Sequence, residues 1–455
     1  MPIDPQASPA YRPETTLLTL GDAFFDPVTA ADFPDTMLRF RNDRAAAQVG
    51  LAGLDDAEWA RHFGRFAPLP DTLPGPLALR YHGHQFRNYN PDLGDGRGFT
   101  FAQMRDDRGR LMDLGTKGSG QTPWSRAGDG RLTLKGGVRE ILATEMLEAL
   151  NVPTSRTLSL IETGERLQRG DEPSPTRSAV LVRLNHSHVR IGTFQRLAYE
   201  RDEASLRKLV GYTLRNLYDE DSDDPVRLLD RVVARTARLA ARYMAAGFVH
   251  GVLNSDNINV TGESFDYGPW RFAPTWDPGF TAAYFDHEGL YAFGRQPEAI
   301  HWDVMQLAVS LRPLAESEPL ITALDTFGPR YQTEVSEAIL WRLGVQPSDP
   351  DGDRALVQAT ELALRTTGSS LDRFFFDAFG GDLPPEYGAP WDDVRTRLAG
   401  YAARKDRAHP YWSGSPCSML IDEVESIWSG IADHDDWGAL EAKIAVIRAM
   451  GAALA

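Results

Sequence analysis

The sequence predicts an α+β fold in two lobes, a mostly β lobe followed by a mostly helical lobe. Short apolar runs separated by turn residues fill the chain from about residue 76 to 200. Helical periodicity of apolar residues dominates from about residue 201 onward, where the composition changes. Four prolines between residues 68 and 76 mark a break before the first of these regions. We therefore divide the chain into an N-terminal extension (1–75), a β-rich lobe (76–200) and a helical lobe (201–455).

The β lobe is expected to contain a hairpin, one helix and a second pair of strands. Strands at 99–104 and 111–115 flank the hairpin turn sequence DDRG at 106–109. A polar loop follows to about residue 134. An amphipathic helix is then expected at 139–150, ended by Asn151 and Pro153. Strands at 157–161 and 179–184 complete this lobe.

The helical lobe begins with two long predicted helices, at 204–218 and 225–246. The second has an apolar face made of Leu228, Leu229, Val232, Val233 and Leu239. A polar, irregular stretch at 247–278 interrupts the pattern. Further helices are expected around 299–313, 330–343, 353–366, 391–405 and 438–453.

The composition of the 455-residue chain is that of a globular protein, with 42% hydrophobic and 25% charged residues. Its net charge is −16, whereas surfaces that bind nucleic acid or anionic membranes carry clustered Lys and Arg, so we expect neither partner. The first residues, MPIDPQASPAYRPETTL, lack the basic and apolar regions of a secretory signal. Cys417 is the one cysteine, which excludes an intramolecular disulfide. We expect a soluble, cytoplasmic monomer.

The first candidate binding element is Gly94-Asp95-Gly96-Arg97-Gly98, which leads into the expected strand at 99–104. Glycines allow the backbone to approach phosphates closely and leave N–H groups free to donate. Because the chain contains 40 glycines, a plain hairpin turn is the default interpretation of this motif taken alone.

Lys117 ends the strand at 111–115, and Glu140 lies in the first turn of the expected helix. In protein kinases a strand lysine binds nucleotide phosphates and is held by a glutamate of a neighbouring helix. An arbitrary Lys/Glu pair is more often two surface charges. The order of glycine turn, strand lysine and helix glutamate nevertheless favours a protein-kinase-like site, and with it a kinase-like two-lobed fold.

The most informative stretch is HGVLNSDN at 250–257, followed by DYG at 266–268. It fits the kinase patterns H-R-D-L-x-x-x-N and D-F-G, with Asn257 and Asp266 at the metal-ligand positions. Such oxygen ligands suit a magnesium ion that bridges phosphates. The position of the kinase base holds Val252, and Asp256 is the carboxylate nearby that can replace it. Without the Lys117 and Glu140 signal, an Asn/Asp-rich turn would be the favoured interpretation.

These stretches resemble the selenoprotein O family, whose members are kinase-like protein nucleotidylyltransferases. The resemblance covers roughly residues 15–430 and depends on motifs that follow in one order. They are YHGHQF at 81–86, DLGDGR at 92–97, KGSGQTPWSR at 117–126, GDGR at 128–131, RE at 139–140, PTSR at 153–156, HGVLNSDN at 250–257, DYGP at 266–269, DPGF at 277–280 and QP at 296–297.

The resemblance implies that ATP binds in the orientation opposite to that in kinases, with the γ-phosphate deep and the α-phosphate facing the acceptor. AMP then passes to Ser, Thr or Tyr hydroxyl groups of proteins and pyrophosphate leaves; UMP transfer from UTP is also ascribed to the family. The resemblance further implies that Asp256 is the general base, that Asn257 and Asp266 bind Mg²⁺ or Mn²⁺, and that Glu140 supports Lys117. The implied nucleotide-binding residues are Gly94, Gly96, Arg97, Lys117, Asp129, Gly130, Arg183, Arg190 and Asp266.

The chain departs from the family pattern in three places. The stretches 135–138 (KGGV) and 186–189 (HSHV) differ from the usual sequences, which can alter nucleotide preference. The C-terminus lacks the usual Cys or selenocysteine element, so redox control through a disulfide is not expected. We expect the C-terminal helix to be docked by apolar contacts from residues such as Ile444, Val446 and Ile447.

Three other functions stay open at this point. A kinase that transfers the γ-phosphate shares the metal ligands and the Lys117–Glu140 pair. Only Val252 and the two arginines Arg183 and Arg190 argue against it. A non-catalytic nucleotide-binding protein needs no base. A metal site made of His82, His84, His186 and His188 is a further alternative, although two distant H-x-H pairs are more often hydrogen-bonding histidines. The protein substrates, the choice between ATP and UTP, and the metal are left undetermined.

Overall fold

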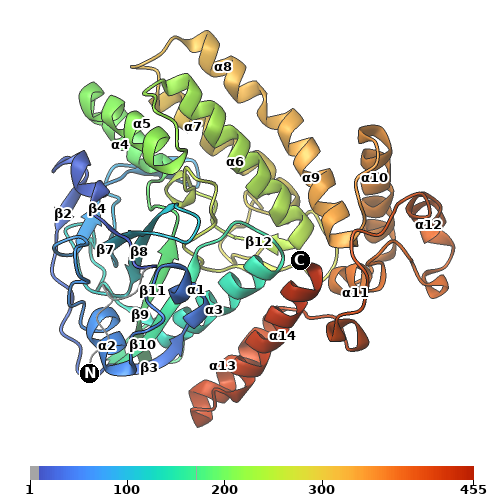
Figure 1. Cartoon of the computed structure of the whole chain (residues 1–455), viewed down its shortest axis with the longest axis horizontal. Helices are drawn as coiled ribbons and strands as arrows, with labels where there is room; N and C mark the ends of the chain where they lie inside the picture. Colours follow the sequence, from blue (N-terminus) through green and yellow to red (C-terminus); the bar gives the residue numbers. More distant parts are fainter. Residues whose placement is uncertain (1–9, 171) are drawn as a thin grey trace.

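A computed structural model of the protein describes residues 10–170 and 172–455. About half of the stretch for which we expect no secretory signal, residues 1–9, therefore lies outside the described residues. Figure 1 shows a β lobe at one side of the molecule, with the later helices arranged around it and the C-terminal helix returning to its edge.

The β lobe is built on an antiparallel sheet of nine strands in the described part of the chain. The strand order is β2-β4-β7-β8-β11-β10-β3, with β1 paired to β7 and β9 paired to β11. The strands are β1 Pro13–Glu14, β2 Phe25–Pro27, β3 Met37–Arg41, β4 Leu77–Leu79, β7 Thr100–Arg105, β8 Leu111–Lys117, β9 Leu132–Thr133, β10 Arg156–Leu167 and β11 Thr176–Asn185. The predicted hairpin is β7 and β8, and the second predicted strand pair is β10 and β11, both longer than expected.

Residues 10–75 are joined to this sheet. β2 pairs with β4, β1 with β7, and β3 with β10 at the edge. Helices α1 (Asp43–Gln48) and α2 (Asp56–Phe63) cover one face, where Trp59 and Phe63 are fully buried. The segment expected as an N-terminal extension thus supplies strands and core side chains to the β lobe.

The helix of the β lobe, α3 (Leu134–Ala149), begins five residues earlier than predicted. The Thr133 side chain caps it by accepting from the N–H of Gly136. Glycines are poor helix formers, which is why the sequence pattern misses this turn. A Cβ atom on Gly137 would lie 2.3 Å from Leu160 Cδ1 on β10, so this glycine lets the helix pack directly on the sheet.

The helical lobe contains most of the helices predicted for it. α5 and α6 agree with their predicted ranges within one residue, and α7, α9, α10 and α14 within three. Four helices, α4, α8, α11 and α13, were not predicted. The bounds are α4 Ile191–Glu200, α5 Glu203–Leu217, α6 Pro225–Ala246, α7 Gln296–Ser310, α8 Ser317–Asp325, α9 Phe327–Leu343, α10 Pro350–Thr367, α11 Leu371–Asp377, α12 Asp392–Leu398, α13 Ile421–His434 and α14 Gly438–Leu454.

The prediction of a helix at 391–405 is wrong in its second half, because α12 ends at Leu398. Beyond Gly400 the chain turns to pair with the loop after α9, where Ala403 bridges Val345 and the N–H of Arg404 donates to the carbonyl of Gly344. Backbone hydrogen bonds to a distant segment here replace the helical ones.

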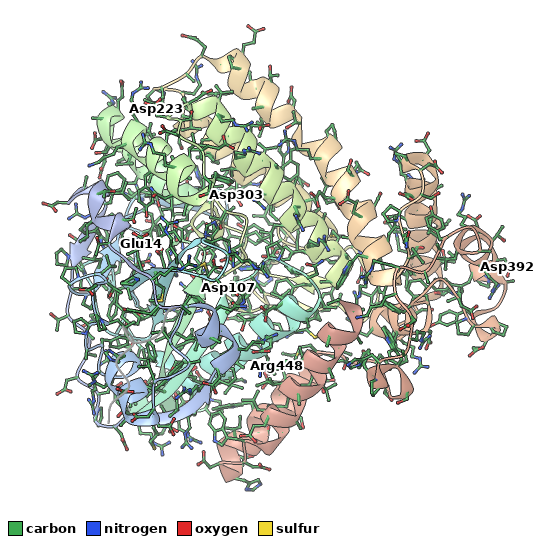
Figure 2. All side chains as sticks on the ribbon, in the orientation of Figure 1. Glu14, Asp107, Asp223, Asp303, Asp392 and Arg448 are labelled. Carbon is green, nitrogen blue, oxygen red and sulfur yellow. The ribbon has the colours of Figure 1, made fainter. Side chains whose placement is uncertain are left out.

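The C-terminal helix α14 packs on α3. Arg448 of α14 points toward α3 and binds Glu145 through both carboxylate oxygens, at 2.9 and 2.7 Å (Figure 2). Ile444 and Ile447 are buried as expected, whereas the prediction for Val446 is wrong, since it is 44% exposed. Apolar contacts and a half-buried ion pair therefore both dock this helix.

The fold is the predicted α+β, kinase-like arrangement of a β lobe followed by a helical lobe. The polar stretch that follows α6 lies between the two lobes and contains the short strands β12 (Phe248–Val249) and β13 (Arg271–Phe272). Within the described residues, no helix is both long and apolar enough to cross a membrane.

Candidate functional site

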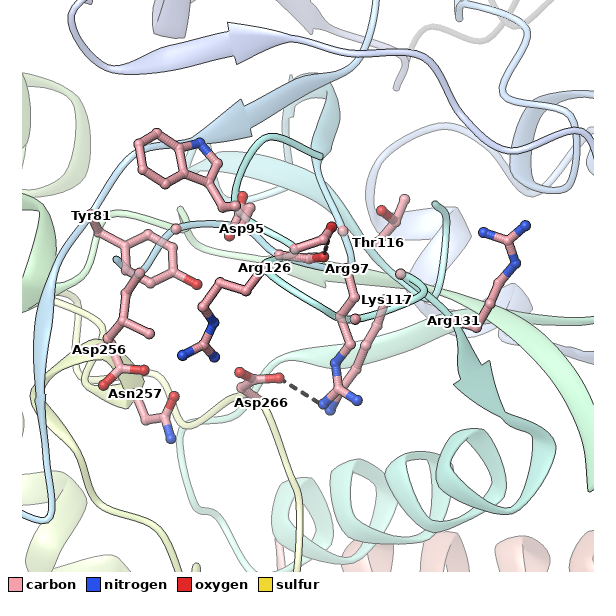
Figure 3. A pocket seen from close by; sticks show the side chains of 18 of the residues that line it. Tyr81, Asp95, Arg97, Thr116, Lys117, Arg126, Arg131, Asp256, Asn257 and Asp266 are labelled. Atoms are coloured by element: carbon pink, nitrogen blue, oxygen red, sulfur yellow. Dashed lines mark hydrogen bonds and ion pairs between the residues drawn. The ribbon is translucent and has the colours of Figure 1, made fainter. Parts of the chain in front are cut away.

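A cleft of about 690 Å³ lies where the two lobes meet (Figure 3). It is lined by every residue expected at the site except Glu140, which lies just beneath. These lining residues are Gly94, Gly96, Arg97, Lys117, Asp129, Gly130, Arg183, Arg190, Asp256, Asn257 and Asp266. Residues separated by more than 170 positions in the sequence are thus brought to one cavity.

The buried end of the cleft is a cluster of alternating charges. Lys117 Nζ lies 2.7 Å from Glu140 Oε2 and 3.1 Å from Asp266 Oδ1. Arg183 Nη1 lies 3.5 Å from each of the same two carboxylates. β8, α3, β11 and the loop after β12 supply one of these side chains each. Two cations therefore face the cleft while two carboxylates hold them in place.

Asp266 joins the two lobes within this cluster. Its backbone φ is 61°, in the left-handed region that residues other than glycine seldom adopt. Burial alone would raise the pKa of Asp266, but Lys117 and Arg183 outweigh it and hold the pKa well below its ordinary value. The carboxylate is therefore ionised at neutral pH and able to bind a cation.

Asp256 lies on the short 3-10 turn Ser255–Asn257 and is 8% exposed. Its Oδ1 atom has no hydrogen-bond partner among the described residues. Burial raises the pKa of Asp256 to about 7, against the opposing effect of Arg190. Val252, at the position of the kinase base, lines the same cleft without an ionisable group.

Arg190 connects this turn to the β lobe. The residue precedes α4 and is 2% exposed. Its Nη1 donates to the carbonyl oxygen of Asp256 at 3.3 Å, and its Nη2 lies 3.3 Å from Asp95 Oδ1. The guanidinium carbon lies 4.0 Å from the centre of the Tyr81 ring. The buried guanidinium group of Arg190 therefore contacts the backbone of Asp256, the expected base.

The glycine motif has close packing partners within the protein. A Cβ atom on Gly94 would lie 2.4 Å from Trp124 Cγ, and one on Gly96 would lie 2.9 Å from the Trp124 carbonyl oxygen. The Thr122 hydroxyl also donates to the carbonyl of Asp95 at 2.6 Å. The loop at 122–126 covers Gly94 and Gly96 and leaves no space for a side chain at either position. Packing within the protein therefore already explains why both residues are glycine.

Several cleft residues escaped the sequence interpretation. Arg126 is directed into the cleft between Asp256 and Asp266 (Figure 3), and Arg169 binds Asp129 at 2.8 and 3.0 Å. Further basic or aromatic examples are Tyr81, Trp124 and Arg131. All but Arg169 lie within or next to the motifs quoted above, and their basic or aromatic character was the available signal.

The balance of charge in the cleft is positive although the protein is acidic. The lining cations are Arg97, Lys117, Arg126, Arg131, Arg169, Arg183 and Arg190, and the lining carboxylates are Asp95, Asp129, Asp256 and Asp266. Since several of these cations have guanidinium groups, the cleft suits a polyanion such as a triphosphate.

The cleft offers two oxygen ligands that suit a divalent metal. The Asn257 side-chain amide donates to the carbonyl of Val252 at 3.1 Å, which leaves its Oδ1 atom available, and Asp266 supplies an ionised carboxylate. Across the described ranges, no group of three or more His, Cys, Asp or Glu is arranged to hold a metal ion. Two protein oxygens completed by phosphate oxygens are the usual setting for Mg²⁺.

The four histidines of the alternative metal site lie in two separate places. His82 Nδ1 lies 2.8 Å from the Tyr89 hydroxyl, and His84 Nδ1 lies 2.7 Å from Gln195 Nε2. His188 faces Asp113, and both nitrogens of His186 face backbone carbonyls. Each pair is engaged in its own hydrogen bonds, as expected for structural histidines.

Comparisons with known proteins agree with this geometry. The family described as "Protein adenylyltransferase SelO" matches residues 8–381. The chain belongs to the SelO family. A protein named "Protein nucleotidyltransferase YdiU" from Synechocystis sp. is 43% identical, with 93% of this chain and 95% of the relative aligned. One of the same name from Gloeobacter violaceus is 44% identical over 93% and 92% of the two chains.

As a SelO-family protein, the chain is a nucleotidyltransferase enzyme, a class that uses a nucleotide substrate and usually a divalent metal. Among solved structures, ROP2 from Toxoplasma gondii, described as having a protein-kinase fold and no enzymatic activity, aligns with 71% of this chain and 82% of its own. The two chains are 12% identical, with a TM-score of 0.24.

Proposed function

We propose that the protein transfers AMP from ATP to Ser, Thr or Tyr hydroxyl groups of other proteins, with release of pyrophosphate. The observation that carries this proposal is the pairing of two features in one cleft. The buried end holds the cations Lys117 and Arg183, while the carboxylate of Asp256 lines the same cleft, and Val252 replaces the kinase base. Membership of the SelO family agrees with it.

In this proposal the nucleotide binds with its terminal phosphates at the buried end. Lys117 and Arg183 bind the β- and γ-phosphates there, and Arg190, which donates to the carbonyl of Asp256, lines the same cleft. Their positive charges stabilise the charge that develops on the leaving pyrophosphate. Arg97 and Asp129, which are exposed, and Gly130, which is buried, line the path of the nucleotide.

The acceptor reacts at the α-phosphorus. Asp256 accepts the proton of the attacking hydroxyl group, the oxygen forms a bond to the α-phosphorus, and the bond from that phosphorus to the pyrophosphate oxygen breaks. Asn257 and Asp266 hold a divalent metal, Mg²⁺ or Mn²⁺, which neutralises phosphate charge when bound. Glu140 orients Lys117 from α3.

The experiment uses ATP labelled at either the α- or the γ-phosphate, with the purified protein and a cytoplasmic extract as the source of acceptors. We expect protein-bound label from the α position only, and an AMP adduct on hydroxyl side chains by mass spectrometry. Label transferred from the γ position alone would identify the protein as a kinase.

The nucleotide and the metal are tested in the same assay. UTP labelled at the α position should give a UMP adduct if the cleft accepts both bases, and the ratio of the two rates measures the preference. Mg²⁺ and Mn²⁺ are supplied separately after treatment with a chelator. We further propose that the protein acts in the cytoplasm and as a monomer. The mass of the active species in solution tests whether it is a monomer.

A further inference from the structure

The motif YHGHQF at 81–86 has no role in the proposed chemistry, yet nearly every residue of it touches the turn that holds Asp256 or the start of α4. It forms the strand β5 (Gly83–Gln85), which pairs with β6 (Asn88–Asn90) in a small hairpin apart from the main sheet. This hairpin contacts the turn at 255–257 and α4. The two segments are about 170 residues apart in sequence, as the 171-residue separation of His84 and Ser255 shows.

Gly83 is in direct contact with the carboxylate of Asp256. A Cβ atom on Gly83 would lie 2.9 Å from both Cβ and Oδ1 of Asp256, closer than side-chain carbons approach one another in proteins. On the other side of the strand, a Cβ atom on Gly192 of α4 would lie 2.1 Å from the carbonyl oxygen of His82. The strand is therefore held between α4 and the Asp256 turn with no space for a side chain at either glycine.

A closed set of hydrogen bonds fixes the residue next to Asp256. The backbone N–H of His84 donates to Ser255 Oγ at 2.7 Å, and Ser255 Oγ donates to Gln195 Oε1 at 2.6 Å. The Gln195 amide nitrogen lies 2.7 Å from His84 Nδ1, which closes the ring. Ser255 and Gln195 are 0% and 4% exposed, so water does not compete for these bonds.

One residue earlier, the turn is held again. The N–H of Phe86 donates to Asn254 Oδ1 at 3.0 Å, and the Tyr291 hydroxyl donates to the same oxygen at 2.7 Å. The residues at 254 and 255 are thus bonded to the hairpin, and the residue at 256 rests on its glycine. These bonds involve the side chains that precede Asp256, while the carboxylate oxygen Oδ1 itself stays without a partner in the described part of the chain.

We propose that the hairpin is the positioning element for Asp256: Gly83 limits where the carboxylate can lie, and Gln195, through Ser255, fixes the turn that carries it. This inference depends on the proposed role of Asp256 as the base. Neither Gly83 nor Gln195 takes or gives a proton or binds the nucleotide in this proposal; both act through Asp256 and are therefore positioning residues. A displacement of about 1 Å at a reacting group can cost on the order of 100-fold in rate, which sets the size of the expected effect.

The test compares Gly83→Ala and Gln195→Ala with Gly75→Ala, a matched control, because a Cβ atom on Gly75 would meet nothing within 4 Å. Turnover of AMP transfer, the dissociation constant for ATP and the melting temperature are measured for each variant. We expect about a 10- to 100-fold loss of turnover in the first two variants, with ATP affinity close to that of the parent protein and a melting temperature lowered by only about 2–4 °C. Gly75→Ala should be unchanged in all three.

The combined variant Asp256→Ala with Gly83→Ala separates positioning from damage to the fold. If Gly83 acts through Asp256, the combination is no slower than Asp256→Ala alone. Full turnover in both Gly83→Ala and Gln195→Ala, or equal losses of ATP binding and turnover in both, overturns the inference. A combination much slower than Asp256→Ala does the same. Full activity of Asp256→Ala itself would instead refute the proposed base, and the two failures are therefore distinguishable.

Discussion

Lys117 Nζ lies 2.7 Å from Glu140 Oε2, and the two side chains are only 4% and 1% exposed. The same ammonium group is 3.1 Å from Asp266 Oδ1. One cation thus links a strand and a helix of the β lobe to the loop that joins the helical lobe. Because it also faces the cleft, a ligand that binds there acts directly on the contact between the lobes.

Lys117→Met and Glu140→Gln should each lower turnover by about 100-fold or more, since both alter the position of the phosphates. The fold should persist in Lys117→Met, because Arg183 remains 3.5 Å from Glu140 and balances its charge. Turnover and melting temperature without nucleotide are the measurements. Lys135→Met is the control, since Lys135 lies on the same helix as Glu140 but pairs with Glu425 of α13, away from the cleft. A large fall in melting temperature in either site variant would indicate a structural ion pair.

Asp266→Ala should abolish activity more completely than Asp256→Ala. Loss of the metal ligand removes both positioning and charge neutralisation, whereas loss of a general base typically costs about 10²–10⁴-fold. The measurement is the rate of AMP transfer over a range of Mg²⁺ and Mn²⁺ concentrations. Asp266→Ala should not be rescued by excess metal, and Asp256→Ala should keep the metal dependence of the parent protein. Equal and mild losses in both variants would make this loop structural.

Activity should be the same with and without dithiothreitol. Cys417 is 4% exposed, and burial raises the pKa of its thiol to about 11, so the reactive thiolate is scarce at neutral pH. We expect slow alkylation of the folded protein and fast alkylation in denaturant, measured by mass spectrometry. A several-fold activation by reductant that Cys417→Ser removes, together with a dimer under oxidation, would point to an intermolecular disulfide.

Asp303→Asn should stabilise the protein at pH 8. Asp303 of α7 (labelled in Figure 2) is 1% exposed, and neither carboxylate oxygen has a hydrogen-bond partner among the described residues. Burial, with a contribution from Asp256, raises its pKa well above the ordinary value, against a small opposing effect of Arg87. The folded state therefore keeps a proton that the unfolded state loses above about pH 4, and the free energy of unfolding falls as pH rises.

Melting temperatures of Asp303→Asn and the parent protein between pH 5 and 8 test this. The difference should be smallest at pH 5 and grow with pH, because the amide has no proton to lose. Asp382→Asn, at an exposed position, should change neither value. A lower melting temperature for Asp303→Asn at every pH would mean that the carboxylate makes a contact that an amide cannot replace.

The sequence predicted the parts of this protein that depend on neighbouring residues. The hairpin of β7 and β8 and the helices α5 and α6 follow from apolar periodicity and turn residues within one short window. The order of Lys117, Glu140, Asn257 and Asp266 along the chain predicted the residues at the cleft. It could do so because each motif is recognised from the spacing of residues within a short stretch of sequence. The sequence could not place α4, since the helix starts directly after Arg190 without a capping side chain.

Only the tertiary structure decided which distant residues touch. The contact of Gly83 with Asp256, the packing of Trp124 on Gly94, and the ion pair of Arg448 with Glu145, 303 residues apart, leave no local pattern. Each depends on how the two lobes and the C-terminal helix pack, so the free energy of the whole fold determines it. Residue types and their spacing along the chain thus determined the chemistry available to this protein, and packing across the two lobes decided where each group acts.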